Sequence, residues 1–217
     1  MMGGKLLLII GLFPFVVSFI VAQFFGVRRF SLLADSKKTA LEVAELILEM
    51  EGVTVVLRRS WWFGANPLKG KEFSLSKEHA SSQDIRKVAT VAHTAGMAVL
   101  QLAHEKSVLM RYKSIRFASV MPLFAIIAAI LARVVGKVGT SMCLGLVSLS
   151  LGLACVASLI NLATEREAAR RAIHILESKG FFKKLSEQEM FEEALYGIAY
   201  VNALPKIFHK FVFARKQ

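Results

Sequence analysis

The stretch LLLIIGLFPFVVSFIVAQFF, residues 6–25, contains no charged side chain. A helix of this length crosses the ~30 Å hydrocarbon layer of a bilayer. The apolar run continues to Arg28 and Arg29 without the small-x-small site that normally ends a signal peptide. The segment is therefore predicted to be a retained membrane anchor, in which Pro14 is tolerated as it is in other membrane helices.

Further apolar segments follow the anchor. Phe117 to about Val135 and Val138 to Ala163 are separated by a short basic stretch and predict a membrane hairpin. The second of them carries small residues at three- and four-residue spacing, which lets helices approach closely and predicts a central place in a bundle. A fourth segment, 194–213, is interrupted by Pro205 and by charged residues, so it either spans the membrane or lies at its interface, and the interface is favoured. The small residues are Gly145, Ser148, Ser150, Gly152, Ala154, Ala157 and Ser158.

Composition supports a membrane protein. Hydrophobic residues make up 55% of the 217 residues, and the net charge is +12. The basic residues flank apolar segments and no nucleic-acid motif accompanies them, so we expect a lipid bilayer rather than nucleic acid as the partner. Because Arg and Lys cluster after the first and third spans, the segments that follow these spans are predicted to be cytoplasmic and the N-terminus to be outside.

The region between the first two spans is polar enough to be exposed to water. Lys38 to Met50 predicts an amphipathic helix with a capping box of Thr39 and Glu42. Residues 53–57 and 72–76 predict two strands of a β-hairpin, with a turn at 66–70 between them. A long helix from about Ser82 to Leu109 follows.

Residues 91–98 read VAHTAGMA and lie in the middle of that long helix. In the H-E-x-x-H motif of zinc peptidases, two histidines one turn apart bind the ion and the glutamate takes a proton from the metal-bound water. His93 matches the first histidine, but Thr94 stands at the position of the base and Met97 at that of the second ligand. A hydroxyl is a poor base near neutral pH, and a thioether is a poor zinc ligand.

The order and spacing of these segments resemble the bacterial integral-membrane neutral zinc metallopeptidases of the YugP type over nearly the whole chain. The resemblance implies an α-rich membrane protein of the bacterial inner membrane. It would combine a zincin-like α+β cytoplasmic domain (helix, small β-hairpin, long helix) with a bundle of three or four transmembrane helices. The matching segments are Thr39–Ala44, Phe73–Ser76, Val91–Ala98, Thr164–Ala172 and Ala199–Val201.

On this basis the chain is divided into four parts. Residues 1–26 form the anchor, 27–116 the zincin-like domain, 117–163 the transmembrane hairpin and 164–217 a set of basic amphipathic helices. The resemblance also implies a substrate groove beside the second strand, at Phe73 and Leu75.

Carried over to this sequence, the family's active site is degenerate. The first zinc ligand falls on His93, the catalytic base on Thr94, the second ligand on Met97 and the third ligand on or beside Asn161. The family's segment before the second strand falls on residues 63–67, which keep only its proline. The expected vestigial site therefore consists of His93, Thr94, Met97 and Asn161. We expect it to have no catalytic residue, no bound metal and no cofactor.

Charged residues follow Asn161 closely enough to leave the position of the third ligand open, because Glu165 or Glu167 could occupy it. The run that they belong to is more simply interpreted as a solvated helix face with ion pairs. The run consists of Glu165, Arg166, Glu167, Arg170 and Arg171.

Three hypotheses for function follow, in order of preference. The first is a catalytically inactive pseudopeptidase that serves as a binding or regulatory scaffold for membrane-associated peptides or another membrane protein. The second is a divergent zinc metallopeptidase whose metal ligands have moved elsewhere in the chain. The third is a purely structural membrane protein.

Overall fold

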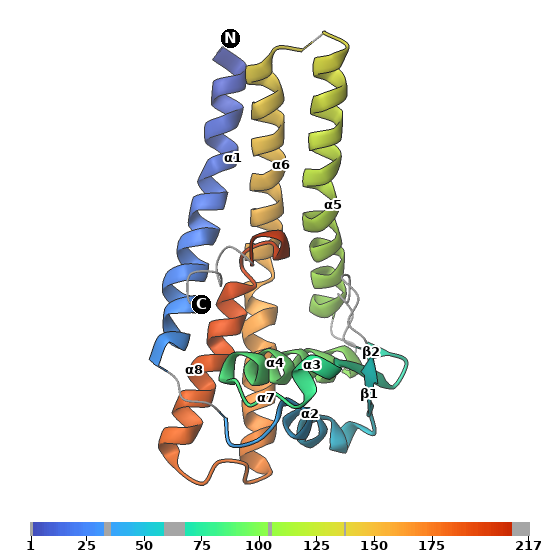
Figure 1. Cartoon of the computed structure of the whole chain (residues 1–217), viewed down its shortest axis with the longest axis vertical. Helices are drawn as coiled ribbons and strands as arrows, with labels where there is room; N and C mark the ends of the chain where they lie inside the picture. The colour runs from blue at the N-terminus through green and yellow to red at the C-terminus, as the bar shows by residue number, and fades with distance from the viewer. Residues whose placement is uncertain (1, 33–35, 59–67, 104–105, 137, 210–217) are drawn as a thin grey trace.

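The computed structural model describes residues 2–32, 36–58, 68–103, 106–136 and 138–209. Three helices stand side by side, α1 (Met2–Ile20), α6 (Thr140–Ile160) and α5 (Lys106–Val134), and the remaining elements gather at one end of them (Figure 1). The described residues contain three helices that are long and apolar enough to cross a membrane, and α1, α5 and α6 form their apolar parts. Large hydrophobic side chains on these helices are exposed, as in a lipid-facing surface.

Helix α6 lies between α1 and α5, as its small residues predict (Figure 1). A Cβ atom added to Gly11 of α1 would come within 2.2 Å of the backbone of Ser148. One added to Gly152 would come within 2.6 Å of the carbonyl oxygen of Gly11. The Ser148 hydroxyl also donates a hydrogen bond of 3.0 Å to the carbonyl of Leu8 on α1. Glycine on both helices therefore sets the close approach of α1 to α6.

The chain continues beyond the C-terminal end of α6 with almost no change of direction. Helix α7 (Leu162–Ser178) begins after one intervening residue, and α8 (Leu185–Val201) returns antiparallel beside it (Figure 1). A helix over 194–213 is wrong, because α8 ends at Val201 and Pro205 precedes a short 3₁₀ turn, Lys206–Phe208. Helix α8 is not among the three apolar helices of membrane length.

Helix α2 (Ala40–Leu48) begins where the sequence predicts. The Thr39 side chain accepts from the backbone N–H of Glu42, and the Glu42 carboxylate accepts from that of Thr39, which completes the capping box. The helix tightens into a 3₁₀ turn at Glu49–Glu51 and ends at Gly52, whose φ of +62° suits a residue without a side chain.

The predicted β-hairpin is wrong in its pairing. The sheet has three strands in the order β1–β3–β2, namely β1 (Thr54–Arg58), β3 (Glu72–Ser76) and β2 (Leu68–Lys69). β1 and β3 run parallel, and the hairpin forms between β2 and β3 instead, through a turn in which Gly70 has φ of +65°. A strand pattern does not reveal direction, and here the glycine turn determines which strand folds back.

The side chains of Phe73 and Leu75 point into the core, with 1% and 4% of their surface exposed. β3 is the central strand of the sheet, with β1 and β2 on its two sides. A substrate groove beside it remains a prediction. Residues 63–67 lie outside the described residues.

The expected long helix is divided in two. Helix α4 (Ile85–Leu102) follows a short helix α3 (Lys77–Ala80), and α5 begins separately at Lys106. One face of α4 packs between α2, α7 and α8 in the main core. Because α5 runs unbroken from Lys106 to Val134, the boundary expected between residues 116 and 117 falls inside one helix.

Candidate degenerate metal site

Helix α4 carries the degenerate motif into the core. The Asp84 carboxylate caps its start by accepting from the N–H of Arg86 at 2.8 Å. On the buried face lie His93 and, one turn later, Met97, with 2% and 1% of their surface exposed. Thr94 turns partly outward, and its hydroxyl donates to the carbonyl of Thr90 at 2.7 Å, within its own helix.

Gly96 determines how closely α7 approaches the motif. A Cβ atom at this position would meet the carbonyl oxygen of Ala168 at 2.2 Å and the side chain of Ala172 at 3.1 Å. Gly96 therefore packs directly against the backbone of α7. The close crossing brings the first turn of α7 directly over His93.

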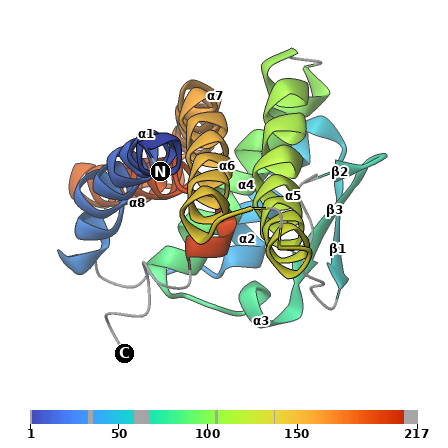
Figure 2. The same ribbon diagram turned by 90° about the horizontal axis from the view of Figure 1, so that it is seen from above.

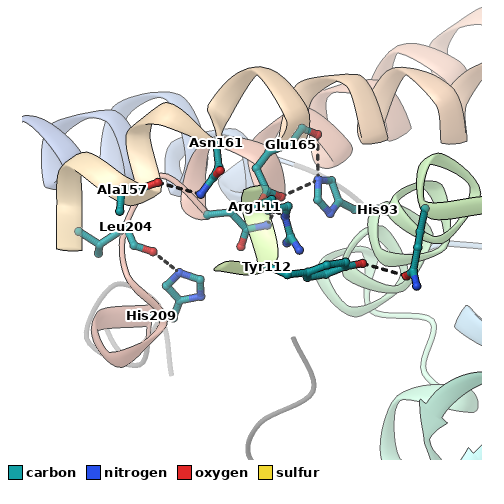
Figure 3. A network of polar contacts seen from close by, with 10 residues as sticks. His93, Arg111, Tyr112, Ala157, Asn161, Glu165, Leu204 and His209 are labelled. Atoms are coloured by element: carbon teal, nitrogen blue, oxygen red, sulfur yellow. Dashed lines mark hydrogen bonds and ion pairs between the residues drawn. The ribbon is translucent and has the colours of Figure 1, made fainter. Parts of the chain in front are cut away.

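Glu165, in that first turn, contacts the histidine (Figure 3). The Nε2 atom of His93 lies 3.0 Å from the backbone oxygen of Glu165 and 3.3 Å from its Oε2 atom. The Oε2 atom also accepts a hydrogen bond of 2.9 Å from the side-chain amide of Asn202, just after α8. With 1% of its surface exposed, Glu165 is a buried carboxylate.

Arg111 of α5 supplies the opposite charge. Its Nε atom donates to the Oε1 atom of Glu165, and 7% of the residue is exposed. The neighbouring Tyr112 donates to the side-chain oxygen of Gln101 on α4 at 3.0 Å. The network of His93, Glu165, Arg111 and Asn202 thus joins α4, α7, α5 and the end of α8 (Figure 3).

The hydrogen bonds of His93 indicate its proton position. The two atoms within 3.3 Å of its Nε2 are oxygens of Glu165, which accept hydrogen bonds, so Nε2 is assigned the hydrogen and donates it. Burial lowers the pKa of His93 below its ordinary value of 6.5; Glu165 opposes this effect and Arg111 adds to it. The ring is therefore neutral at pH 7, and Nε2 has no free lone pair directed at Glu165.

The four expected vestigial residues lie in different surroundings in the structure. His93 and Met97 share the buried face of α4, and Met97 packs in an apolar cluster with Tyr112 and Ala168. Thr94 faces away. Asn161 is buried, and its amide donates to the carbonyl of Ala157 at 2.7 Å, one turn earlier in the same helical path.

Glu165, one turn beyond Asn161, is the residue that reaches His93. Its interpretation as part of a solvated helix face is wrong, whereas Glu167 and Arg170 do form an exposed ion pair of 3.4 Å on that face. The partners Arg111 and Asn202 had no sequence signal of their own. For Glu165 the signal was its place one turn from the expected third ligand.

Comparison with known proteins identifies the family of this chain. A family model described as "Putative neutral zinc metallopeptidase" matches residues 5–209. This chain belongs to the neutral zinc metallopeptidase family. No curated protein and no solved structure matches the chain.

A neutral zinc metallopeptidase needs ligands with free lone pairs around its ion and a base beside the bound water. In this member the residues at the motif do not fit a zinc ion. His93 donates to Glu165, Met97 lies in an apolar cluster, and the carboxylate of Glu165 is already paired with a guanidinium. Among the described residues, no group of three or more His, Cys, Asp or Glu side chains is placed to hold a metal.

Proposed function

We propose that this chain is a catalytically inactive member of its family, a pseudopeptidase that serves as a binding or regulatory scaffold in the membrane. The observation that carries the proposal is the ion pair of Arg111 with Glu165 beside His93. In the family's arrangement a zinc ion would neutralise such a carboxylate. Here a guanidinium does so, and it keeps its charge at every physiological pH.

The position of the general base supports the same conclusion. Thr94 has no carboxylate to offer, and its hydroxyl is engaged by the carbonyl of Thr90. A proton acceptor must lie within hydrogen-bond reach of the water that it activates. Relocated metal ligands would have to come from elsewhere, and no cluster among the described residues supports that alternative.

A scaffold role fits an architecture in which apolar helices continue directly into a folded domain. The domain is proposed to lie in the cytoplasm, because Arg28, Arg29 and Arg166 follow the apolar parts of α1 and α6 at the same end. Its ligands would be membrane-associated peptides or another membrane protein, including an active relative.

Metal content tests the proposal most directly. Elemental analysis of detergent-purified protein, wild type beside His93→Ala, should give less than about 0.1 zinc per chain for both. Peptidase activity against unfolded protein substrates should be equal in wild type, His93→Ala and a protein-free control. The fold of each sample is checked by its helical circular dichroism.

Stoichiometric zinc that is lost in His93→Ala, together with activity that a chelator removes, would overturn the proposal. It would instead support a divergent peptidase. Zinc that is retained in His93→Ala would mean that ligands elsewhere in the chain bind it.

A further inference from the structure

A cavity of about 400 Å³ that is open to the surface lies between α7, α8 and the 3₁₀ segment η2 (Val27–Leu32). Two arginines line it, Arg29 of η2 and Arg166 of α7. The rest of its lining comes from one face of α8. This cavity is separate from the His93 network, since none of that network's residues lines it.

The cavity lies where the apolar helices meet the domain. Arg29 lies three residues after the π-helical turn Val21–Gly26 that ends the apolar run of α1, and Arg166 follows the end of α6 by six residues. Helix α8 packs against the π-helical turn, η2 and α7, and the view along the bundle shows α8 beside α7 (Figure 2). Lipid headgroups occupy this level of a membrane protein.

The side chains that α8 contributes to the cavity change from tyrosine to glutamate along the helix. Tyr200 and Tyr196 line the part towards the membrane helices, and Glu193, Glu192 and Glu189 continue along the same face towards the start of the helix. The guanidinium of Arg29 lies over the ring of Tyr200, 5.7 Å from its centre. Positive charge and tyrosine hydroxyls therefore lie nearest the membrane, and carboxylates lie further from it.

The opposite charges of the described residues that line the cavity are not joined in direct ion pairs. The ion pairs of the described residues, within 4.0 Å, include none between Arg29 or Arg166 and the three glutamates. By contrast Arg170, on the same helix as Arg166 but outside the cavity, is paired with Glu167. Opposite charges that line one cavity without pairing are suited to a ligand that carries both signs.

We propose that this cavity binds the phosphoethanolamine headgroup of a phospholipid. Arg29 and Arg166 would take the phosphate, because guanidinium groups donate two parallel hydrogen bonds to its oxygens. The glutamates would take the primary ammonium, which donates three. Three carboxylates disfavour a purely anionic headgroup, and a choline headgroup has the same charges as ethanolamine but no N–H to donate.

Native mass spectrometry of the full chain, released from nanodiscs, tests the site. Nanodiscs hold equal amounts of phosphatidylethanolamine and phosphatidylcholine of the same acyl chains. The ethanolamine lipid should be retained about tenfold more than the choline lipid, as expected for one or two charge-assisted hydrogen bonds. Glu193→Gln should remove most of this preference, and Arg166→Gln should weaken retention of both lipids, because they share the phosphate, whereas Arg170→Gln and Glu167→Gln should change neither.

Soluble glycerophosphoethanolamine distinguishes the possible sources of the headgroup. Retention of the lipid alone assigns a membrane lipid, and binding of the soluble ester as well assigns recognition of the headgroup by itself; both support the site. Equal retention of the two lipids by the wild type would overturn the proposal. So would a preference that survives Glu193→Gln, or a retention of both lipids that Arg166→Gln leaves unchanged, in variants with wild-type circular dichroism.

Discussion

Arg111 and Glu165 lie 54 positions apart in the chain and meet as an ion pair that is almost completely buried. The pair connects a helix of membrane length to the first turn of α7, over the histidine of the degenerate motif. Removing one partner from such a pair leaves a charge without compensation in the interior.

The first prediction concerns the energy of this pair. Arg111→Met and Glu165→Met should each lower the free energy of unfolding by about 3 kcal/mol, because each leaves one buried charge alone. The double variant should recover most of that loss, since it buries two apolar side chains instead. Unfolding with sodium dodecyl sulfate in mixed micelles measures all four proteins. Additive effects in the double variant would contradict an energetically coupled pair.

The second prediction concerns pH. Burial lowers the pKa of His93 in the folded chain, so the unfolded chain, with a pKa of about 6.5, binds the proton first as pH falls. The free energy of unfolding should thus be highest above pH 6.5 and should decrease below it. The charged groups that face His93 are Glu165, which opposes the lowering of its pKa, and Arg111, which adds to it. His93→Gln should weaken this dependence in thermal unfolding scans between pH 5 and 8. His174→Gln, at an exposed position of α7, is the control and should leave it unchanged.

The third prediction is that a zinc site can be restored. Thr94→Glu and Met97→His recreate the missing base and second ligand on α4, and Arg111→Ala removes the competing cation from Glu165. The triple variant should bind zinc at about one ion per chain, measured by elemental analysis and calorimetry. The same variant that also carries Glu165→Gln should lose it. If zinc binds equally well with that fourth change, Glu165 is not at the ligand position.

The fourth prediction concerns the crossing of α4 and α7. Gly96→Ala places a methyl group 2.2 Å from the carbonyl oxygen of Ala168, where only a backbone shift can accommodate it. The free energy of unfolding should fall by about 1–3 kcal/mol. Gly3→Ala, inside helix α1 at a glycine with no atom within 4 Å of the added methyl group, is the matched control and should not lower the free energy of unfolding by more than about 0.5 kcal/mol. Equal stability of the two variants would disprove the close crossing.

Local features of this fold can be predicted from the sequence, and long-range ones only in part. The capping box at Thr39 and the helix end at Gly52 depend on residues within a few positions of each other. The small residues of α6 predicted its central place, because close helix packing needs small side chains wherever the partner lies.

The direction of the strands and the buried partners of Glu165 could not be predicted from the sequence in the same way. The parallel register of Thr54 with Glu72 depends on how the intervening segment returns, and a strand pattern does not encode it. Glu165 lies in a run of five charged residues, where exposure is the ordinary expectation. Its burial against Arg111, His93 and Asn202 after folding distinguishes this glutamate from its solvated neighbour Glu167.

The guanidinium at the degenerate site has a consequence for how the protein is made. A metalloenzyme draws part of its folding free energy from an ion, so its stability follows the ion's availability in the cell. In this chain the compensating charge is encoded in the polypeptide and arrives with residue 111 during synthesis. On the proposed function, starvation for zinc should therefore leave the abundance of the protein unchanged.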